Sequence, residues 1–551
     1  MESHEQRIVR FLSNPRSYPH PAGAVGRRET HVSHVFLAGP FAYKLKKPVT
    51  FPFLDASTLA RRKRFCELEL SLNRRLAPDV YLTMVPIVDT GEGLRLGGAG
   101  RIVEWVVKMR RLPEERMLDR LVAGRRVGAR DMVRIAERLM PFFRRAERGA
   151  AVSRHGTPAS VARLVLGNLE ECAPFLGTLL TEAGRQRLAA AYRQYLTLEA
   201  PLLARRWRER RIIDGHGDLR CENICMGPPV EPRRADVCGV SVFDCVEFQP
   251  AFRCADVVND FSFLVMDLEF RGRRDLAEVL LAEYRRRMSD PTFDRILAFY
   301  QCHRSLVRGK VRGFAWLQHP RTLAGRRVRA LSRRHFRLAV RYAARFAPPR
   351  LLVVGGLIGS GKSTLARGLA EGLGAVWLRT DEIRLRGFAV SGAVDRRTQP
   401  VEGRRRGQGF DEGRYAPHVS ELVYQRLIQR AESLLRQGRS VVCDGTFSKA
   451  VGRDTLRDIA RRHGTSFHFF ECTVPRAVAL RRIARRAAAR SDISEARPEH
   501  YARLKAGFEP VCGWPARDWT RMSDDRAPRA TYEAALGVLR RVWSVSERRS
   551  T

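Results

Sequence analysis

Lysine is scarce in this chain, although the chain is strongly basic. Only nine of its 101 basic residues are lysines, and the arginines that make up the rest occur in nearly every segment. The formal net charge of +42 favours contact with a nucleic-acid backbone, because basic groups release its counterions. Since the arginines do not gather in one segment, they indicate a general preference for arginine over lysine. Nucleic acid is therefore the less favoured partner.

Long hydrophobic runs are also absent. No apolar stretch approaches the roughly 18 residues of a membrane-spanning helix, and the first residues, MESHEQRIVRFLSNPRSYPH, contain no apolar signal region. We therefore expect a cytoplasmic protein that does not associate with membranes. Paired zinc-ligand spacings are missing too, and we interpret the cysteines that follow His216 as ordinary buried thiols. These are Cys221, Cys225, Cys238, Cys245 and Cys254.

Two blocks of different pattern meet near Pro348 and Pro349, as expected for a chain of 551 residues. The first block has strand-like runs around one helix and then becomes mostly helical, which predicts two lobes. The second alternates strands and helices, which predicts a parallel sheet. The expected divisions are a first domain at 1–320 (small lobe about 25–112, large lobe 113–320), a basic helical linker at 321–349 and a second domain at 350–551.

A phosphate-binding loop is predicted at the start of the second block. The segment GLIGSGKST follows an apolar strand directly and opens a helix. Its glycines let backbone amides turn toward phosphates at the helix N-terminus. Its lysine supplies charge to the β- and γ-phosphates, and the Ser363 hydroxyl that follows the lysine can ligate Mg2+. The residues expected to bind ATP here are Gly356, Gly359, Ser360, Gly361, Lys362, Ser363 and Thr364, with Ser363 also on the metal.

Two carboxylates and two arginines complete this predicted site. Ligands of an open parallel sheet bind at the carboxyl ends of its strands. Asp381 ends the second expected strand, where it would orient or deprotonate an acceptor hydroxyl, unless it only caps a helix. Asp444 ends the third strand and would hold Mg2+. Arg482 and Arg486 share a helix face and would close over the transferring phosphate, unless they form a solvated surface.

A second set of catalytic residues is predicted in the first block. In HGDLRCENI, Asp218 and Asn223 are spaced as in kinase catalytic loops, where the aspartate accepts or orients the hydroxyl proton and the asparagine ligates Mg2+. Asp244, in VFDCVEF, would be the second metal ligand.

The kinase arrangement also requires a strand lysine paired with a helix glutamate. Lys44 and Lys46 lie on one strand face, and Glu67 and Glu69 lie on the following helix. We select Lys44 and Glu69 and leave the other two as alternatives.

These motifs carry a resemblance to known families. HGDLRCEN resembles the aminoglycoside phosphotransferase-like branch of the protein-kinase fold, and residues 350–520 resemble predicted P-loop kinases. The whole chain is similar to bacterial proteins in which the two are fused, through FAYKLKKPV and DCVEFQPAFRCADVVNDFSFLVMDLE among other stretches. It departs from the kinase pattern in two ways: no glycine-rich loop precedes Lys44, and Cys-Val-Glu follows Asp244 where kinases have Phe-Gly.

The resemblance implies an α+β kinase-like domain followed by an α/β P-loop domain, and an ATP- and Mg2+-dependent phosphotransferase that acts on a hydroxyl of a small molecule. Two alternatives remain. In the first alternative, the second domain is a polynucleotide kinase-like enzyme. In the second, one half of the chain binds ATP only to regulate the other half.

Overall fold

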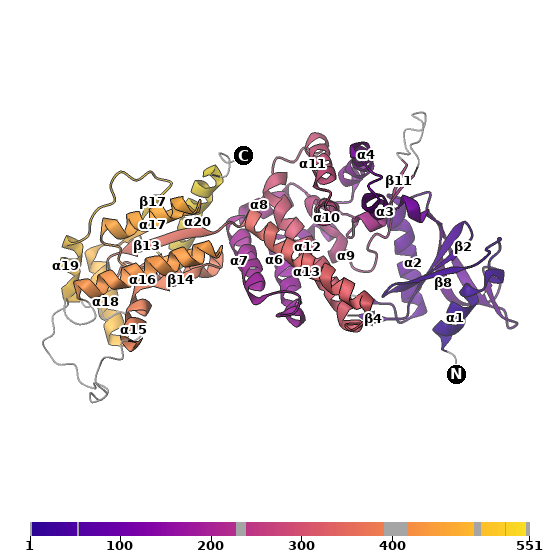
Figure 1. Ribbon diagram of the computed structural model, residues 1–551, viewed down its shortest axis with the longest axis horizontal. Coiled ribbons are helices and arrows are strands. Elements are labelled where there is room, and N and C mark those ends of the chain that lie inside the picture. The colour runs from indigo at the N-terminus through magenta and orange to yellow at the C-terminus, as the bar shows by residue number, and fades with distance from the viewer. Residues whose placement is uncertain are drawn as a thin grey trace. The chain divides into compact units, whose positions relative to one another are not determined.

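The computed structural model describes residues 3–51, 54–227, 239–390, 416–489, 498–523 and 525–546. The chain divides into two compact units (Figure 1). Unit 1 contains residues 1–168 and 202–338, and unit 2 contains residues 169–201 and 339–551.

Unit 1 begins with an antiparallel sheet in the order β1-β2-β3-β8-β6-β7. One long helix, α2, packs against β6 and β8 (Figure 1). The tight Gly39-Pro40 turn joins β2 to β3, so β3 carries Lys44 and Lys46 into the middle of the sheet. The bounds are α1 His4–Ser13, β1 Gly26–Glu29, β2 Ser33–Ala38, β3 Phe41–Lys46, β4 Thr50–Phe51, β5 Leu54–Asp55, α2 Leu59–Arg74, β6 Tyr81–Asp89, β7 Leu94–Leu96 and β8 Arg101–Arg110.

The rest of unit 1 is mainly helical. Its central helix α10 is buried over nearly its whole length, and two small two-stranded sheets, β9 with β12 and β10 with β11, carry the predicted catalytic segments. The bounds are α3 Leu118–Ala123, α4 Ala129–Arg145, α5 Ala150–Ser153, α6 Pro158–Glu170, α8 Ala200–Arg208, β9 Ile212–Asp214, β10 Ile224–Met226, β11 Val240–Val242, α9 Pro250–Arg253, β12 Cys254–Asp256, α10 Val257–Phe270, α11 Arg274–Arg287, α12 Phe293–Gln318 and α13 Leu323–Phe346. A sheet lobe and a helical lobe form the expected kinase-like fold.

Unit 2 is built on a parallel sheet in the order β14-β15-β13-β16-β17. All five strands point the same way, so their carboxyl ends form one edge. The bounds are α7 Glu182–Leu198, β13 Arg350–Gly356, α14 Lys362–Leu373, β14 Val376–Arg379, α15 Thr380–Val390, α16 Pro417–Arg436, β15 Val441–Asp444, α17 Ala450–Arg462, β16 Ser466–Thr473, α18 Arg476–Ala489, α19 Tyr501–Ala506, β17 Trp519–Ser523 and α20 Pro528–Ser546.

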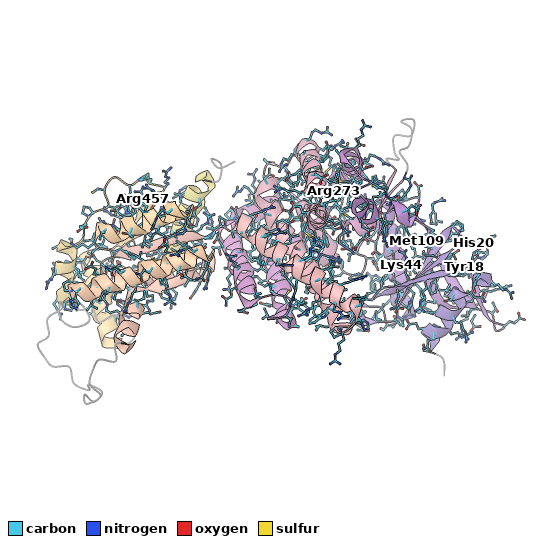
Figure 2. The ribbon with its side chains drawn as sticks, viewed as in Figure 1. Tyr18, His20, Lys44, Met109, Arg273 and Arg457 are labelled. Carbon is cyan, nitrogen blue, oxygen red and sulfur yellow. The ribbon has the colours of Figure 1, made fainter. Side chains whose placement is uncertain are left out.

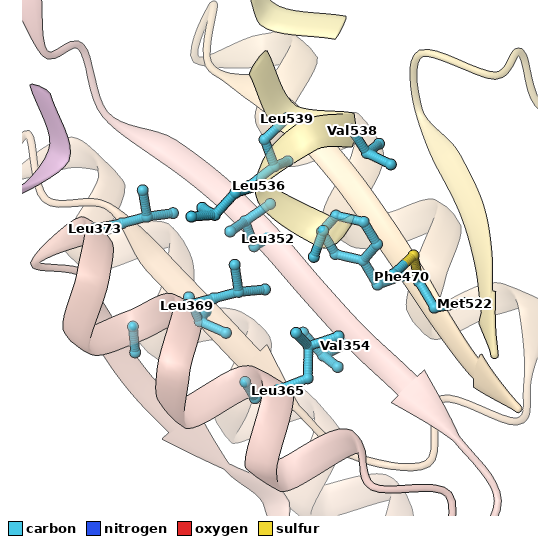
Figure 3. Packing of buried hydrophobic residues seen from close by; sticks show 14 of the residues in the cluster. Leu352, Val354, Leu365, Leu369, Leu373, Phe470, Met522, Leu536, Val538 and Leu539 are labelled. Carbon is cyan, nitrogen blue, oxygen red and sulfur yellow. The ribbon is translucent and has the colours of Figure 1, made fainter. Parts of the chain in front are cut away.

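Helices cover both faces of this sheet because side chains alternate along each strand. Leu352 and Val354 of β13 pack on one face against α14 and α20 (Figure 3). Leu351 and Val353 point to the other face, against α16 and α17. The central strand is therefore buried on both sides, which fixes the loop that follows it.

Helix α7 packs against α14 within unit 2. The Thr197 hydroxyl donates a hydrogen bond to the Gly372 carbonyl, at 2.6 Å. The observed unit therefore includes residues 169–201, which precede the linker expected at 321–349. Across the described residues, every helix is too short or too polar to traverse a bilayer.

Candidate functional sites

Lys44 of β3, which is labelled in Figure 2, lies at the centre of an ion network in unit 1. Its ammonium nitrogen is 2.7 Å from Glu69 Oε1 and 2.7 Å from Asp244 Oδ1. Burial alone would lower the pKa of Lys44, but the carboxylates of Asp244 and Glu69 raise it well above its usual value. The structure thus brings together Lys44, Glu69 and Asp244. The alternative, Glu67, is exposed and lies near Lys63 instead.

Lys46 extends the same network. Its ammonium is 2.5 Å from Glu69 Oε2, and it also pairs with Glu247, the glutamate of the Asp-Cys-Val-Glu sequence. All three side chains are buried. Glu247 therefore links the segment that carries Asp244 to Lys46 of strand β3 and, through Lys46, to Glu69 of helix α2. The sequence pattern did not assign Glu247 a role.

Replacing Glu247 by glutamine is expected to lower the free energy of unfolding by about 1–3 kcal/mol, because Lys46 loses one of two buried carboxylates. Chemical denaturation measures the change. The matched control is Glu67→Gln, which removes an exposed glutamate on α2 and should cost less than about 0.5 kcal/mol. Equal costs in the two variants would contradict the structural role of the Lys46–Glu247 pair.

Asp218 and Asn223 lie together in the loop between β9 and β10. Asn223 donates its side-chain amide to Asp218 Oδ2 at 2.9 Å. Arg220 donates two hydrogen bonds of 2.7 Å to the Asp218 carboxylate. Burial would raise the pKa of Asp218, but the Arg220 charge outweighs it and holds that pKa well below its usual range. The carboxylate is therefore ionised near neutral pH and able to accept a hydrogen bond from an acceptor hydroxyl.

Buried Asp260 of α10 fixes the backbone of this loop. It accepts hydrogen bonds from the backbone amides of His216 and Gly217, at 2.6 and 2.9 Å. The His216 ring lies 2.9 Å from the Phe243 carbonyl, so it links the loop to the residue before Asp244. Asp244 itself adopts a φ of 62°, a strained conformation of the kind that gathers at functional sites.

The structure describes four of the five cysteines near His216. Cys221, Cys225, Cys245 and Cys254 are buried, and burial raises the pKa of each thiol. Cys238 lies outside the described residues.

The glycine-rich loop of unit 2 joins β13 to α14. Gly356, Gly359 and Gly361 have φ values of 140°, 78° and 86°, which other residues rarely adopt. A side chain on Gly359 would come within 2.7 Å of the Ala479 carbonyl oxygen of α18. The Ser360 hydroxyl is buried and has no hydrogen-bond partner among the described residues. The loop therefore offers the open backbone and polar groups that phosphates require.

Ser363 and Asp444 meet at the carboxyl edge of the sheet. The Ser363 hydroxyl donates to Asp444 Oδ1 at 3.2 Å. Burial raises the pKa of Asp444, and the charge of Lys362 opposes that rise. Arg379, which the sequence reasoning did not select, lies 3.7 Å from Asp444. A hydroxyl beside a buried carboxylate suits a hard cation such as Mg2+.

The remaining predicted residues of unit 2 are less closely grouped. Asp381 is in the first turn of α15, near enough to Asp444 to influence its pKa. Arg482 of α18 lies 3.5 Å from the Gly359 carbonyl, whereas Arg486 is half-buried one turn further along the same helix. Thr364 is exposed.

Comparisons with known proteins concern both the P-loop region and the whole chain. A family model described as an AAA domain matches residues 351–511. The uncharacterized protein Rv2004c of Mycobacterium tuberculosis is 34% identical over 469 residues, which cover 84% of this chain and 87% of that protein. The uncharacterized protein Mb2027c of Mycobacterium bovis matches equally well.

Two solved kinases also resemble parts of the chain. A gluconokinase from Sinorhizobium meliloti 1021 covers 37% of this chain and 99% of its own, with 17% identity and a TM-score of 0.27. A choline/ethanolamine kinase family protein from Mesorhizobium loti covers 61% of this chain and 99% of its own, with 13% identity and a TM-score of 0.34.

The P-loop match and the loop geometry make unit 2 a nucleotide-binding domain. The mycobacterial match is long enough, and its sequence identity high enough, to assign the whole chain to a family. It belongs to the bacterial family of Rv2004c, and residues 351–511 form its P-loop domain.

Proposed function

We propose that the chain is an ATP-dependent phosphotransferase with two nucleotide sites, which transfers the γ-phosphoryl group to a hydroxyl of a small molecule. The observation that carries the proposal is the grouping of Lys44, Glu69 and Asp244 in one unit with Asp218 and Asn223. The Ser363–Asp444 contact beside Lys362 supplies the second site.

In unit 1 the residues have separable roles. Lys44, held by Glu69, would bind the phosphates of ATP. Asn223 and Asp244 would hold Mg2+, which neutralises charge on those phosphates when bound. Asp218 orients the acceptor hydroxyl and takes its proton. The acceptor oxygen forms a bond to the γ-phosphorus, the bond from that phosphorus to the bridging oxygen breaks, and ADP leaves.

In unit 2 the loop amides and Lys362 would hold the triphosphate, with Ser363 and Asp444 on the metal side. Asp381 is the proposed residue facing the acceptor. Arg482, whose guanidinium lies near the Gly359 carbonyl, would contact the transferring group, and Arg486 follows on the same helix.

The test is a phosphorylation screen with radiolabelled ATP and a pool of cellular metabolites. The parent chain should label at least one small molecule, and Asp218→Ala and Lys362→Ala should each remove labelled products or ATP turnover. Single-stranded nucleic acid belongs in the same screen as the alternative acceptor of unit 2. Absence of both turnover and product in the parent would reject the proposal.

A further inference from the structure

An arginine-rich group of side chains lies directly beside Asp218 in unit 1. Arg308 and Arg312 are four residues apart on α12, so they share one face of that helix. Each side chain is only 15% exposed. We refer to Arg220, Arg271, Arg308 and Arg312 as the arginine cluster.

One carboxylate, that of Glu222, serves all four of these guanidinium groups. It pairs with Arg220 and lies 3.1 Å from Arg271. Arg308 and Arg312 approach it only to 3.9 Å. Arg220 also forms an ion pair with Asp218, and Arg271 also forms one with Asp267. Four cations therefore face three carboxylates.

The unmatched charge falls on Arg308 and Arg312. Among the described residues, neither donates a hydrogen bond, and Arg312 Nη1 is buried without a partner. Burial and the neighbouring Arg220 lower the pKa of Arg308 to about 10. Removing a guanidinium from water without hydrogen bonds is costly, so this arrangement is unfavourable unless another anion completes it.

The neighbouring side chains supply no such anion. The His335 ring stacks on Phe270 at 3.7 Å between centroids, and both of its ring nitrogens lack partners within the described part of the chain. Burial and the arginines hold its pKa well below the usual value, so the ring is neutral. Arg312 and Arg334 also lie over Phe270, at 5.5 and 4.5 Å.

We propose that Arg308 and Arg312, with Arg220, bind an anionic group of the phosphoryl acceptor, so that the acceptor of unit 1 is a hydroxyl compound that already carries a phosphate or a carboxylate. This inference rests on the proposed function, because Asp218 defines where the acceptor hydroxyl lies. Arg220 contacts both Asp218 and Glu222, which places the anion site next to the base. Guanidinium groups match phosphate and carboxylate by paired hydrogen bonds. A polycationic acceptor such as an aminoglycoside would meet like charge here.

Calorimetry with inorganic phosphate and with acetate tests the anion site. The full chain is first saturated with AMPPNP and Mg2+, which occupies the phosphate positions of both nucleotide sites. Each anion is then titrated into the parent chain, Arg308→Gln, Arg312→Gln and Arg295→Gln. Arg295 is an exposed arginine of the same helix and serves as the control. The stronger of the two anions distinguishes a phosphate-bearing acceptor from a carboxylate-bearing one.

We expect at least one anion to bind the parent chain, and both cluster variants to weaken that binding at least fivefold while the Arg295→Gln chain behaves as the parent. The proposal would be overturned if neither anion bound the parent chain, or if anion affinity were equal in all four proteins. Uptake of AMPPNP is measured in the same series. If no AMPPNP bound, the proposed function would be rejected instead. The anion titration of the nucleotide-free chain would then still test whether the arginine cluster binds an anion.

Thermal unfolding separates a binding role from a structural one. Arg308→Gln removes an incompletely paired buried cation, so the melting temperature of the ligand-free variant should equal or exceed that of the parent. A lower melting temperature with unchanged anion affinity would show that the cluster only supports the fold.

Discussion

Replacing Asp218 by asparagine is expected to lower the kcat of phosphoryl transfer by unit 1 about 1,000-fold, because a positioned general base contributes about 100- to 10,000-fold. Asparagine keeps the shape of the side chain but cannot take the hydroxyl proton. The Lys44, Glu69 and Asp244 contacts are untouched, so the affinity of unit 1 for MgATP should change little. Single-turnover transfer to the acceptor found by the screen measures kcat, and calorimetry measures affinity.

The control for this experiment is Asp275→Asn, which changes an exposed aspartate of α11 that pairs with Arg273 at the surface. It should retain the parent rate. A rate for Asp218→Asn within threefold of the parent would show that Asp218 does not act as the base. Loss of MgATP affinity together with rate would mean instead that the loop no longer holds its shape without the two Arg220 hydrogen bonds.

Local sequence patterns predicted most of the architecture. The continuous apolar run before the glycine-rich motif located β13, and the motif itself located the start of α14. The aspartate and asparagine of HGDLRCENI are five residues apart, so the same short loop positions both. These features are encoded within a few residues of one another, where propensity and periodicity are informative.

Contacts between distant segments that no kinase motif covers could not be predicted from the sequence. Lys46 and Glu247 are separated by 201 residues, and the type of neither residue indicates which residue it will pair with. Lys46 was an alternative to Lys44 on the same strand face, but nothing in the sequence pointed to Glu247 as its partner. Similarly, α7 precedes the expected boundary, yet it packs on α14. The arginine cluster could not be predicted either, because arginine occurs in nearly every segment of this chain and a single arginine therefore indicates little.

Replacing Lys362 by alanine is expected to reduce the number of MgATP molecules bound per chain from two to one at micromolar nucleotide. Lys362 supplies a charged donor at the N-terminus of α14, and such hydrogen bonds contribute about 1.5–3 kcal/mol, or roughly 10- to 150-fold in affinity. The loop glycines keep their conformations, so the folded unit should persist. Calorimetric stoichiometry is the direct measurement.

Lys505→Ala is the matched control, because Lys505 is an exposed lysine of α19 in the same unit. It should leave two sites. A second variant, Asp244→Ala, removes a proposed metal ligand of unit 1 and should leave the unit 2 site intact, so the two losses are assigned to different units. If Lys362→Ala still bound two nucleotides with parental affinity, the glycine-rich loop would not be a triphosphate site.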